Sequence, residues 1–166
     1  LVSRANKARS IAAKPAMELI TSAAINWCVA ACATPRWAVN VFPGKSESQA
    51  VEALWQAIFK CTRADQPNPV EAWVKHSAAL KQRTEFLNAR NYAALSYKAP
   101  GTDLTIGLAD DHVWKGGESQ ARNGVVYNAN IPTEEVFTMP HKDRVDGTVR
   151  STKPLSYGGT LIDGIE

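Results

Sequence analysis

Two adjacent glutamates, Glu134 and Glu135, are the residues whose types and placement are best suited to chemistry. Carboxylates of this kind serve in acid–base catalysis. The Val136-Phe137 pair that follows predicts that the glutamates open a β-strand, where neighbouring side chains point to opposite faces. One carboxylate can therefore face a cleft while the other faces solvent or a partner group. Two solvated acids at a strand edge are the alternative.

The histidines are the next candidates, because imidazole titrates near neutral pH and is the commonest metal ligand. We interpret His76, on the polar side of a predicted helix, and His112, at a turn after two aspartates, as surface residues. His141 follows a predicted strand and is the best candidate of the three for lining a site. No two histidines have the spacing of a metal-binding motif.

The cysteines, Cys28, Cys32 and Cys61, are odd in number and form no regular framework. This pattern favours a reducing compartment. Cys28 and Cys32 lack the spacing of a zinc knuckle, and we interpret all three as buried small hydrophobic residues.

Composition limits the class of protein. The 166 residues are 45% hydrophobic and 21% charged, which is the balance of a soluble globular chain. The formal charge of +3 comes without a basic run, so we expect no nucleic-acid partner. The sequence shows no secretory signal and no apolar stretch long enough to span a bilayer. We therefore expect a cytoplasmic protein with no membrane partner.

Helices are expected in the first half of the chain. Ser46 and Gln49 predict a capping box. Behind it, apolar residues recur at helical spacing and predict one buried face (Val51, Leu54, Trp55 and Ile58). Asn68 and Pro69 predict the start of a second helix that runs to about residue 90.

Two further elements are expected near the start of the chain. Residues 4–14 are rich in alanine and basic residues, and we expect a helix that stops at Pro15. The apolar run 27–33 is short and continuous, as in a buried strand.

The second half alternates between apolar and polar residues, as in half-buried strands (Leu104, Ile106 and Leu108). Pro100-Gly101 predicts a turn, and Asp146-Gly147 predicts a hairpin turn. The predicted fold class is α/β. Residues 1–92 form an α/β lobe, and residues 93–166 begin a largely antiparallel, β-rich second domain that is incomplete.

Several blocks of sequence also carry a resemblance to a known family. They are Trp27-Cys-Val-Ala-Ala-Cys-Ala-Thr-Pro-Arg-Trp37, Tyr97-Lys-Ala-Pro-Gly-Thr-Asp-Leu-Thr-Ile-Gly-Leu108, Asn130-Ile-Pro-Thr-Glu-Glu-Val-Phe-Thr-Met-Pro-His141 and Ser151-Thr-Lys-Pro-Leu-Ser-Tyr-Gly-Gly159. Together these blocks resemble the aminopeptidase S/T (PepS-type) family of metallo-aminopeptidases. The resemblance keeps the order of the blocks and covers nearly the whole chain from about Asn26 onward.

The resemblance implies a hydrolase that releases amino-terminal residues from peptide substrates and works as a homodimer. It implies two divalent ions, zinc, cobalt, manganese or magnesium, about 3.5–4 Å apart, that activate a bridging water. The first metal-ligating glutamate of the family corresponds to Glu135. Glu134 is the alternative if the alignment shifts by one residue.

The resemblance also implies that this chain is an internal fragment. The remaining metal ligands of the family and its active-site tyrosine lie beyond Glu166, so no catalytic residue is expected within the chain. One carboxylate cannot hold two metal ions, and the isolated chain is expected to carry no cofactor and to be inactive. Residues 1–92 would be the end of the family's amino-terminal domain, and residues 93–166 the start of its catalytic domain. The alternative is a non-catalytic domain that self-associates or binds peptides, suggested by an open sheet edge and five tryptophans.

Overall fold

The computed structural model describes residues 2–157 and 160–162. In it, capping residues begin the two helices that the sequence predicted between residues 46 and 90. Helix α3 (Glu47–Cys61) starts with the predicted capping box. The Ser46 hydroxyl accepts from the Gln49 backbone N–H at 3.4 Å, and the Gln49 side chain accepts from the Ser46 N–H at 3.2 Å. Helix α4 (Pro69–Arg90) starts after Asn68, whose side chain accepts from the Glu71 N–H at 3.1 Å. Both predicted helix starts are confirmed.

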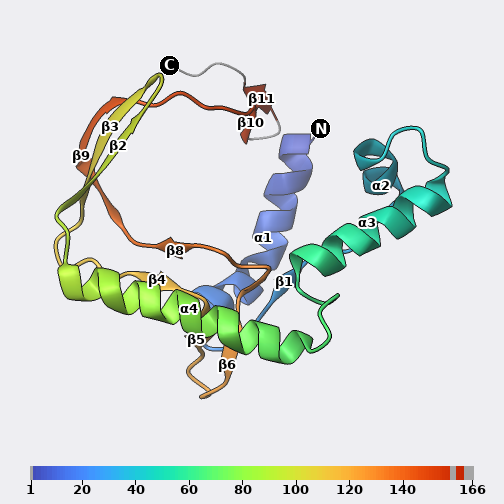
Figure 1. The fold of residues 1–166 in the computed structure, drawn as a ribbon, viewed down its shortest axis with the longest axis horizontal. Coiled ribbons are helices and arrows are strands. Elements are labelled where there is room, and N and C mark those ends of the chain that lie inside the picture. Colours follow the sequence, from blue (N-terminus) through green and yellow to red (C-terminus); the bar gives the residue numbers. More distant parts are fainter. Residues whose placement is uncertain (1, 158–159, 163–166) are drawn as a thin grey trace. The chain divides into compact units, whose positions relative to one another are not determined.

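The described residues group into two compact units. One unit comprises Leu1–Met17, Thr84–Lys115 and Phe137–Glu166, and the other comprises Glu18–Arg83 and Gly116–Val136. The second unit holds an apolar core between α3 and the short helix α2 (Pro35–Val41), which lie next to each other in Figure 1. All four residues of the predicted apolar face of α3 belong to this core. Its buried members are Ala38, Ala50, Leu54 and Ile58, and Ala33, Phe42, Val51 and Trp55 pack against them partly buried.

Two expectations for the start of the chain are wrong. Helix α1 (Val2–Thr21) continues through Pro15, since proline removes only one hydrogen bond and a kinked helix can go on past it. The run 27–33 forms only strand β1 (Val29–Ala30), and Val29 is 58% exposed. This strand pairs in parallel with the equally short β7 (Asn130–Ile131), so no layer covers it.

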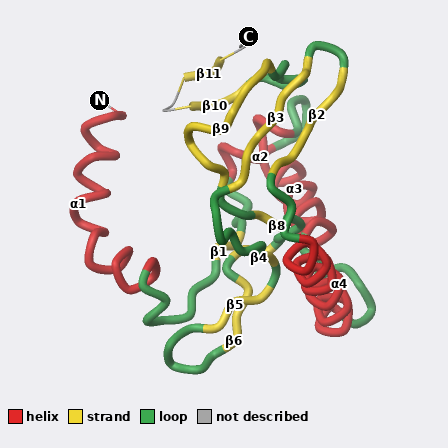
Figure 2. Tube along the Cα trace, turned by 90° about the vertical axis from the view of Figure 1, so that its left-hand side faces the viewer, coloured by secondary structure: helices red, strands yellow, loops and turns green. Residues whose placement is uncertain are grey.

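The first unit contains a three-stranded antiparallel sheet in the order β2-β3-β9, seen as adjacent strands in Figure 2. Strand β2 (Ala94–Ala99) joins β3 (Thr102–Leu108) through the predicted turn, where Gly101 has φ +76°. Exposure alternates from Thr102 to Ile106 as predicted, whereas Gly107 and Leu108 are both buried. The expected hairpin turn at Asp146-Gly147 is wrong, because both residues lie inside β9 (Pro140–Thr148).

Gly147 instead allows strands β3 and β9 to approach each other closely. Its φ is +121°, and a Cβ atom at this position would overlap the carbonyl oxygen of Asp103 on the neighbouring strand β3. Only glycine fits both the conformation and the contact.

Short strand pairs complete the fold: β4 (Lys115–Gly116) with β8 (Val136–Phe137), β5 (Glu118–Gln120) with β6 (Val126–Asn128), and β10 (Leu155–Tyr157) with β11 (Thr160–Ile162). Helices together with antiparallel strand pairs confirm the predicted α/β fold class. The division at residue 92 into two domains of a longer protein stays a prediction. The three cysteines are exposed, so their interpretation as buried residues is wrong. No helix within the described residues is both long and apolar enough to span a bilayer.

Candidate functional site

The two glutamates lie in the segment between β7 and β8, and strand β8 begins only at Val136. The prediction that they open a strand is therefore wrong. In this segment, the Thr133 carbonyl accepts from the His76 side chain of α4, and the Glu134 N–H donates to the Glu135 side chain. The orientations of Glu134 and Glu135 are consequently set by individual contacts and not by the alternation of a strand.

Glu134 is held by Arg63. The guanidinium donates from Nη1 to Glu134 Oε1 at 2.7 Å and from Nη2 to Oε2 at 3.0 Å, a paired geometry that suits arginine and carboxylate. The hydrogen bonds from Arg63 hold the pKa of the Glu134 carboxyl below its ordinary value, and the positive charge nearby adds to this effect. The same contact raises the pKa of Arg63.

Arg63 occupies a special backbone position at the end of α3. Its φ is +60°, and the two hydrogen bonds of a Schellman motif surround it: the Ala64 N–H donates to the Phe59 carbonyl at 2.8 Å, and the Arg63 N–H to the Lys60 carbonyl at 3.3 Å. Glycine adopts this conformation more easily than arginine does. The guanidinium also lies over the Trp73 ring, 5.3 Å from its centroid.

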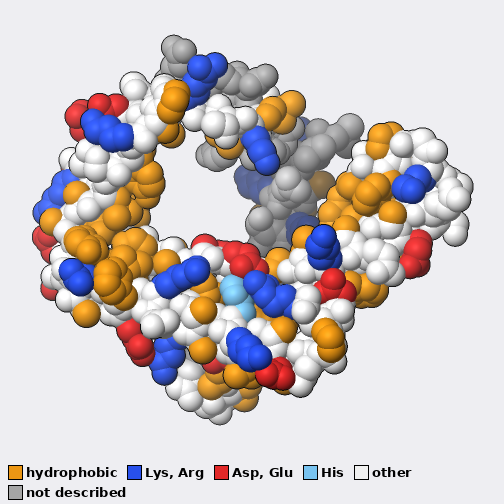
Figure 3. Space-filling model, in the orientation of Figure 1, with side chains coloured by type: hydrophobic (Ala, Val, Ile, Leu, Met, Phe, Trp, Pro, Cys, Tyr) orange, Lys and Arg blue, Asp and Glu red, His pale blue; other side chains and the backbone are white. Residues whose placement is uncertain are grey.

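His76 on α4 is the third member of this cluster. Its Nε2 lies 2.6 Å from the Thr133 carbonyl oxygen, so this nitrogen must carry the proton and donate. Its Nδ1 lies 3.2 Å from Arg63 Nη2 and therefore accepts. The His76 side chain is only 14% exposed, so its interpretation as a surface residue is wrong. In the space-filling view, histidine, basic and acidic side chains lie together over α4 (Figure 3).

Glu135 differs from its neighbour. Its Oε2 accepts from the Glu134 backbone N–H at 3.1 Å, and the side chain is exposed. Within residues 2–157 and 160–162, no cation pairs with this carboxylate. Its remaining oxygen is available to a ligand that is not part of the described chain.

His141, the third predicted site residue, lies in β9. Its Nδ1 accepts from the Asp143 backbone N–H at 3.2 Å, and the ring is partly buried. His141 belongs to the unit that contains the three-stranded sheet, whereas both glutamates belong to the other unit. The described part of the chain contains no group of three or more His, Cys, Asp or Glu side chains that could hold a metal ion.

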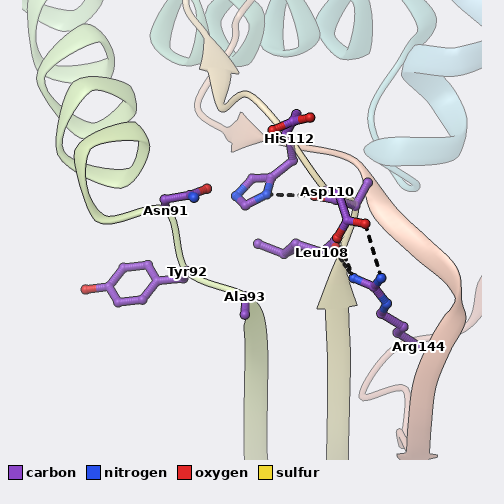
Figure 4. A pocket seen from close by; sticks show the side chains of 9 residues that line it. Asn91, Tyr92, Ala93, Leu108, Asp110, His112 and Arg144 are labelled. Atoms are coloured by element: carbon purple, nitrogen blue, oxygen red, sulfur yellow. Dashed lines mark hydrogen bonds and ion pairs between the residues drawn. The ribbon is translucent and has the colours of Figure 1, made fainter.

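A second polar feature lies entirely in the first unit, where a cavity of about 270 Å³ lies near the end of β3. Figure 4 shows the side chains that line it. Arg144 donates to both oxygens of Asp110 at 2.8 and 3.3 Å, which lowers the pKa of Asp110. His112 Nδ1 donates to the Ala109 carbonyl at 2.9 Å, which leaves Nε2 buried without a partner among the described residues. Sequence reasoning missed this cavity, because Asp110 and Arg144 meet only through the pairing of β3 with β9.

The Arg63–Glu134 contact predicts a dependence of stability on pH. Since the pKa of Glu134 is lower in the folded than in the unfolded state, the stabilisation is fully present above about pH 4.5 and is lost as the pH falls through the lowered folded value. We expect Glu134→Gln to make the loss of stability on acidification less steep, by a small amount because the carboxylate is half-exposed. Urea unfolding midpoints between pH 3 and pH 7 would measure this, and an unchanged acid dependence would contradict it.

Comparisons with known proteins agree with one another. A family model described as thermophilic metalloprotease (M29) matches residues 1–166. The chain is 52% identical over 164 residues to aminopeptidase T of Thermus thermophilus, covering 99% of this chain and 40% of that protein. It is 53% identical over 146 residues to aminopeptidase AmpS of Bacillus subtilis, covering 88% of this chain and 36% of that protein. The solved structure of wild-type AmpT from Thermus thermophilus matches with a TM-score of 0.87 and 49% identity, over 98% of this chain and 40% of that one. The chain thus spans about 40% of the length of these relatives.

Proposed function

The chain belongs to the thermophilic metalloprotease (M29) family, and on that premise we propose that the whole protein carrying it is a metal-dependent aminopeptidase. The relatives whose sequences are about 50% identical to this chain are named as aminopeptidases. The reaction would be the hydrolytic release of amino-terminal residues from peptides. A homodimer in the cytoplasm is part of the same proposal, and it rests on the resemblance of the sequence to the family.

We propose that Glu135, and not Glu134, is the metal ligand that this chain contributes. The observation that carries the assignment is the different engagement of the two carboxylates. Arg63 occupies both oxygens of Glu134, whereas Glu135 has no cationic partner among the described residues. A carboxylate oxygen is a donor that zinc, cobalt, manganese and magnesium all accept, so Glu135 fits a site for a divalent metal.

Two divalent ions bound at the completed site would polarise the scissile carbonyl and lower the pKa of a bound water. Within this chain, Glu135 would hold metal and Arg63 would keep Glu134 away from it. A role of His141 in lining a site stays a prediction from the sequence. The chain alone offers no set of three ligands among its described residues. Catalytic zinc sites use three protein ligands, and we infer that the 166-residue chain by itself holds no metal and is inactive.

The central test is the dependence of activity on metal. The whole protein should release the chromophore from amino-acid anilides, lose this activity after dialysis against a chelator, and regain it on addition of a divalent ion. The isolated chain, assayed in parallel, should show no release with or without metal. Cleavage that persists after chelation would contradict the proposal, and no cleavage after addition of metal would favour the non-catalytic alternative.

A further inference from the structure

We propose that His76 and Arg63 are positioning residues for the Glu135 carboxylate, acting through the peptide group that joins Thr133 to Glu134. This inference rests on the proposed function, in which Glu135 holds metal. All the residues concerned lie in one compact unit, so their contacts are internal to it.

One peptide group connects His76 to Glu135. Its carbonyl belongs to Thr133 and accepts from His76 Nε2 at 2.6 Å. Its N–H belongs to Glu134 and donates to Glu135 Oε2 at 3.1 Å. The peptide group is planar, and in the trans form its C=O and N–H point in opposite directions. Fixing the carbonyl end by His76 therefore fixes the direction of the N–H that holds the carboxylate.

Arg63 contacts both His76 and Glu134 and so restrains the two residues on either side of this peptide group. It donates to His76 Nδ1 at 3.2 Å, which requires that nitrogen to be free of a proton and leaves Nε2 as the donor toward Thr133. It also holds both oxygens of Glu134, the residue whose N–H contacts Glu135. Arg63 thus fixes the tautomer of the histidine and the side chain of the intervening residue.

Two further observations support a positioning role for His76 and Arg63. Thr133 is 6% exposed, so its carbonyl needs a hydrogen-bond partner and His76 supplies it. Arg63 stands at φ +60°, in a helix-ending position that glycine fills more easily. An arginine at this position costs conformational energy that its side-chain contacts must offset.

The first test compares His76→Ala with His76→Gln in the whole protein. The probe is Zn²⁺ added to metal-free protein in competition with a chromophoric chelator. Loss of an outer-shell partner typically weakens metal binding by about 10–100-fold, and we expect a loss in this range for His76→Ala. His76→Gln should recover part of the affinity, because its amide N–H can donate to the Thr133 carbonyl. We expect kcat for an amino-acid anilide to fall more than KM rises.

The second test uses Arg63→Gly, which removes the guanidinium while relieving the strained backbone. The Zn²⁺ affinity should fall as in His76→Ala, while the melting temperature of the metal-free protein stays unchanged or rises. The double variant should lose little more affinity than either single variant, because both act on one peptide group. A merely structural role predicts the reverse, a lower melting temperature with unchanged Zn²⁺ affinity.

The control is Lys75→Ala, an exposed neighbour of His76 on α4 whose ion pair is with Glu71 on the same helix. It should leave Zn²⁺ affinity unchanged. If Glu135→Gln loses Zn²⁺ but His76→Ala and Arg63→Gly do not, the positioning role is wrong and the ligand assignment stands. If Glu135→Gln itself keeps full Zn²⁺ affinity, the ligand assignment fails and the positioning role fails with it.

Discussion

Replacing Glu135 by glutamine in the whole protein is expected to lower kcat for amino-acid anilides by at least about 100-fold, beyond the 10–100-fold typical of changes outside the first ligand shell. The substitution keeps the size of the side chain but exchanges a charged oxygen donor for a neutral amide. Glu135 is exposed, and among the described residues its side chain bonds to one backbone N–H, so the fold should be unaffected. The measurement is steady-state kinetics together with a thermal melting curve of the metal-free protein.

Glu118→Gln is a matched control for this experiment, because Glu118 is also an exposed glutamate in the same unit. It should keep full activity. Activity that survives in Glu135→Gln and disappears in Glu134→Gln would show that the ligand is Glu134. In that case the contact between Arg63 and Glu134 would have to break when metal binds.

Leu54→Ala should produce a large loss of stability, because Leu54 lies in the α2–α3 core. Leu54 is 3% exposed and packs among apolar residues of both helices. Removing three buried carbon atoms leaves a cavity, and substitutions of this kind cost about 2–5 kcal/mol in free energy of unfolding. Urea unfolding followed by tryptophan fluorescence would measure the change, with activity assayed below the transition.

Val70→Ala serves as the control for Leu54→Ala. Val70 is 75% exposed on α4, so its truncation should change the free energy of unfolding by no more than about 0.5 kcal/mol. A variant Leu54→Ala that melts like the parent but loses activity would show that Leu54 acts at the site and not in the core.

The parts of the fold that sequence predicted correctly depend on short-range interactions. The start of α3 is set by Ser46 and Gln49, which are three residues apart and bond to each other's backbone. The apolar face of α3 follows from helical periodicity alone. The turn at Gly101 joins two strands that follow each other directly. In each case the deciding contacts lie within a few residues of the signal.

The features that were predicted wrongly depend on contacts between residues that are far apart in the sequence. Asp146-Gly147 has the composition of a hairpin turn, yet Gly147 lies inside β9 because strand β3 approaches it closely. The run 27–33 has the apolar composition of a buried strand, but the two residues that pair with β7 are exposed. Local composition cannot report which neighbour covers a strand.

The sequence by itself determined the family and the pair of glutamates that could hold metal, because both follow from the identity and order of residues along the chain. Only the tertiary structure separated the two carboxylates. Arg63 and Glu134 are 71 residues apart in sequence, and the fold brings them together at the end of α3. An ion pair of this kind depends on distance in space, which the spacing of residues along the chain does not specify.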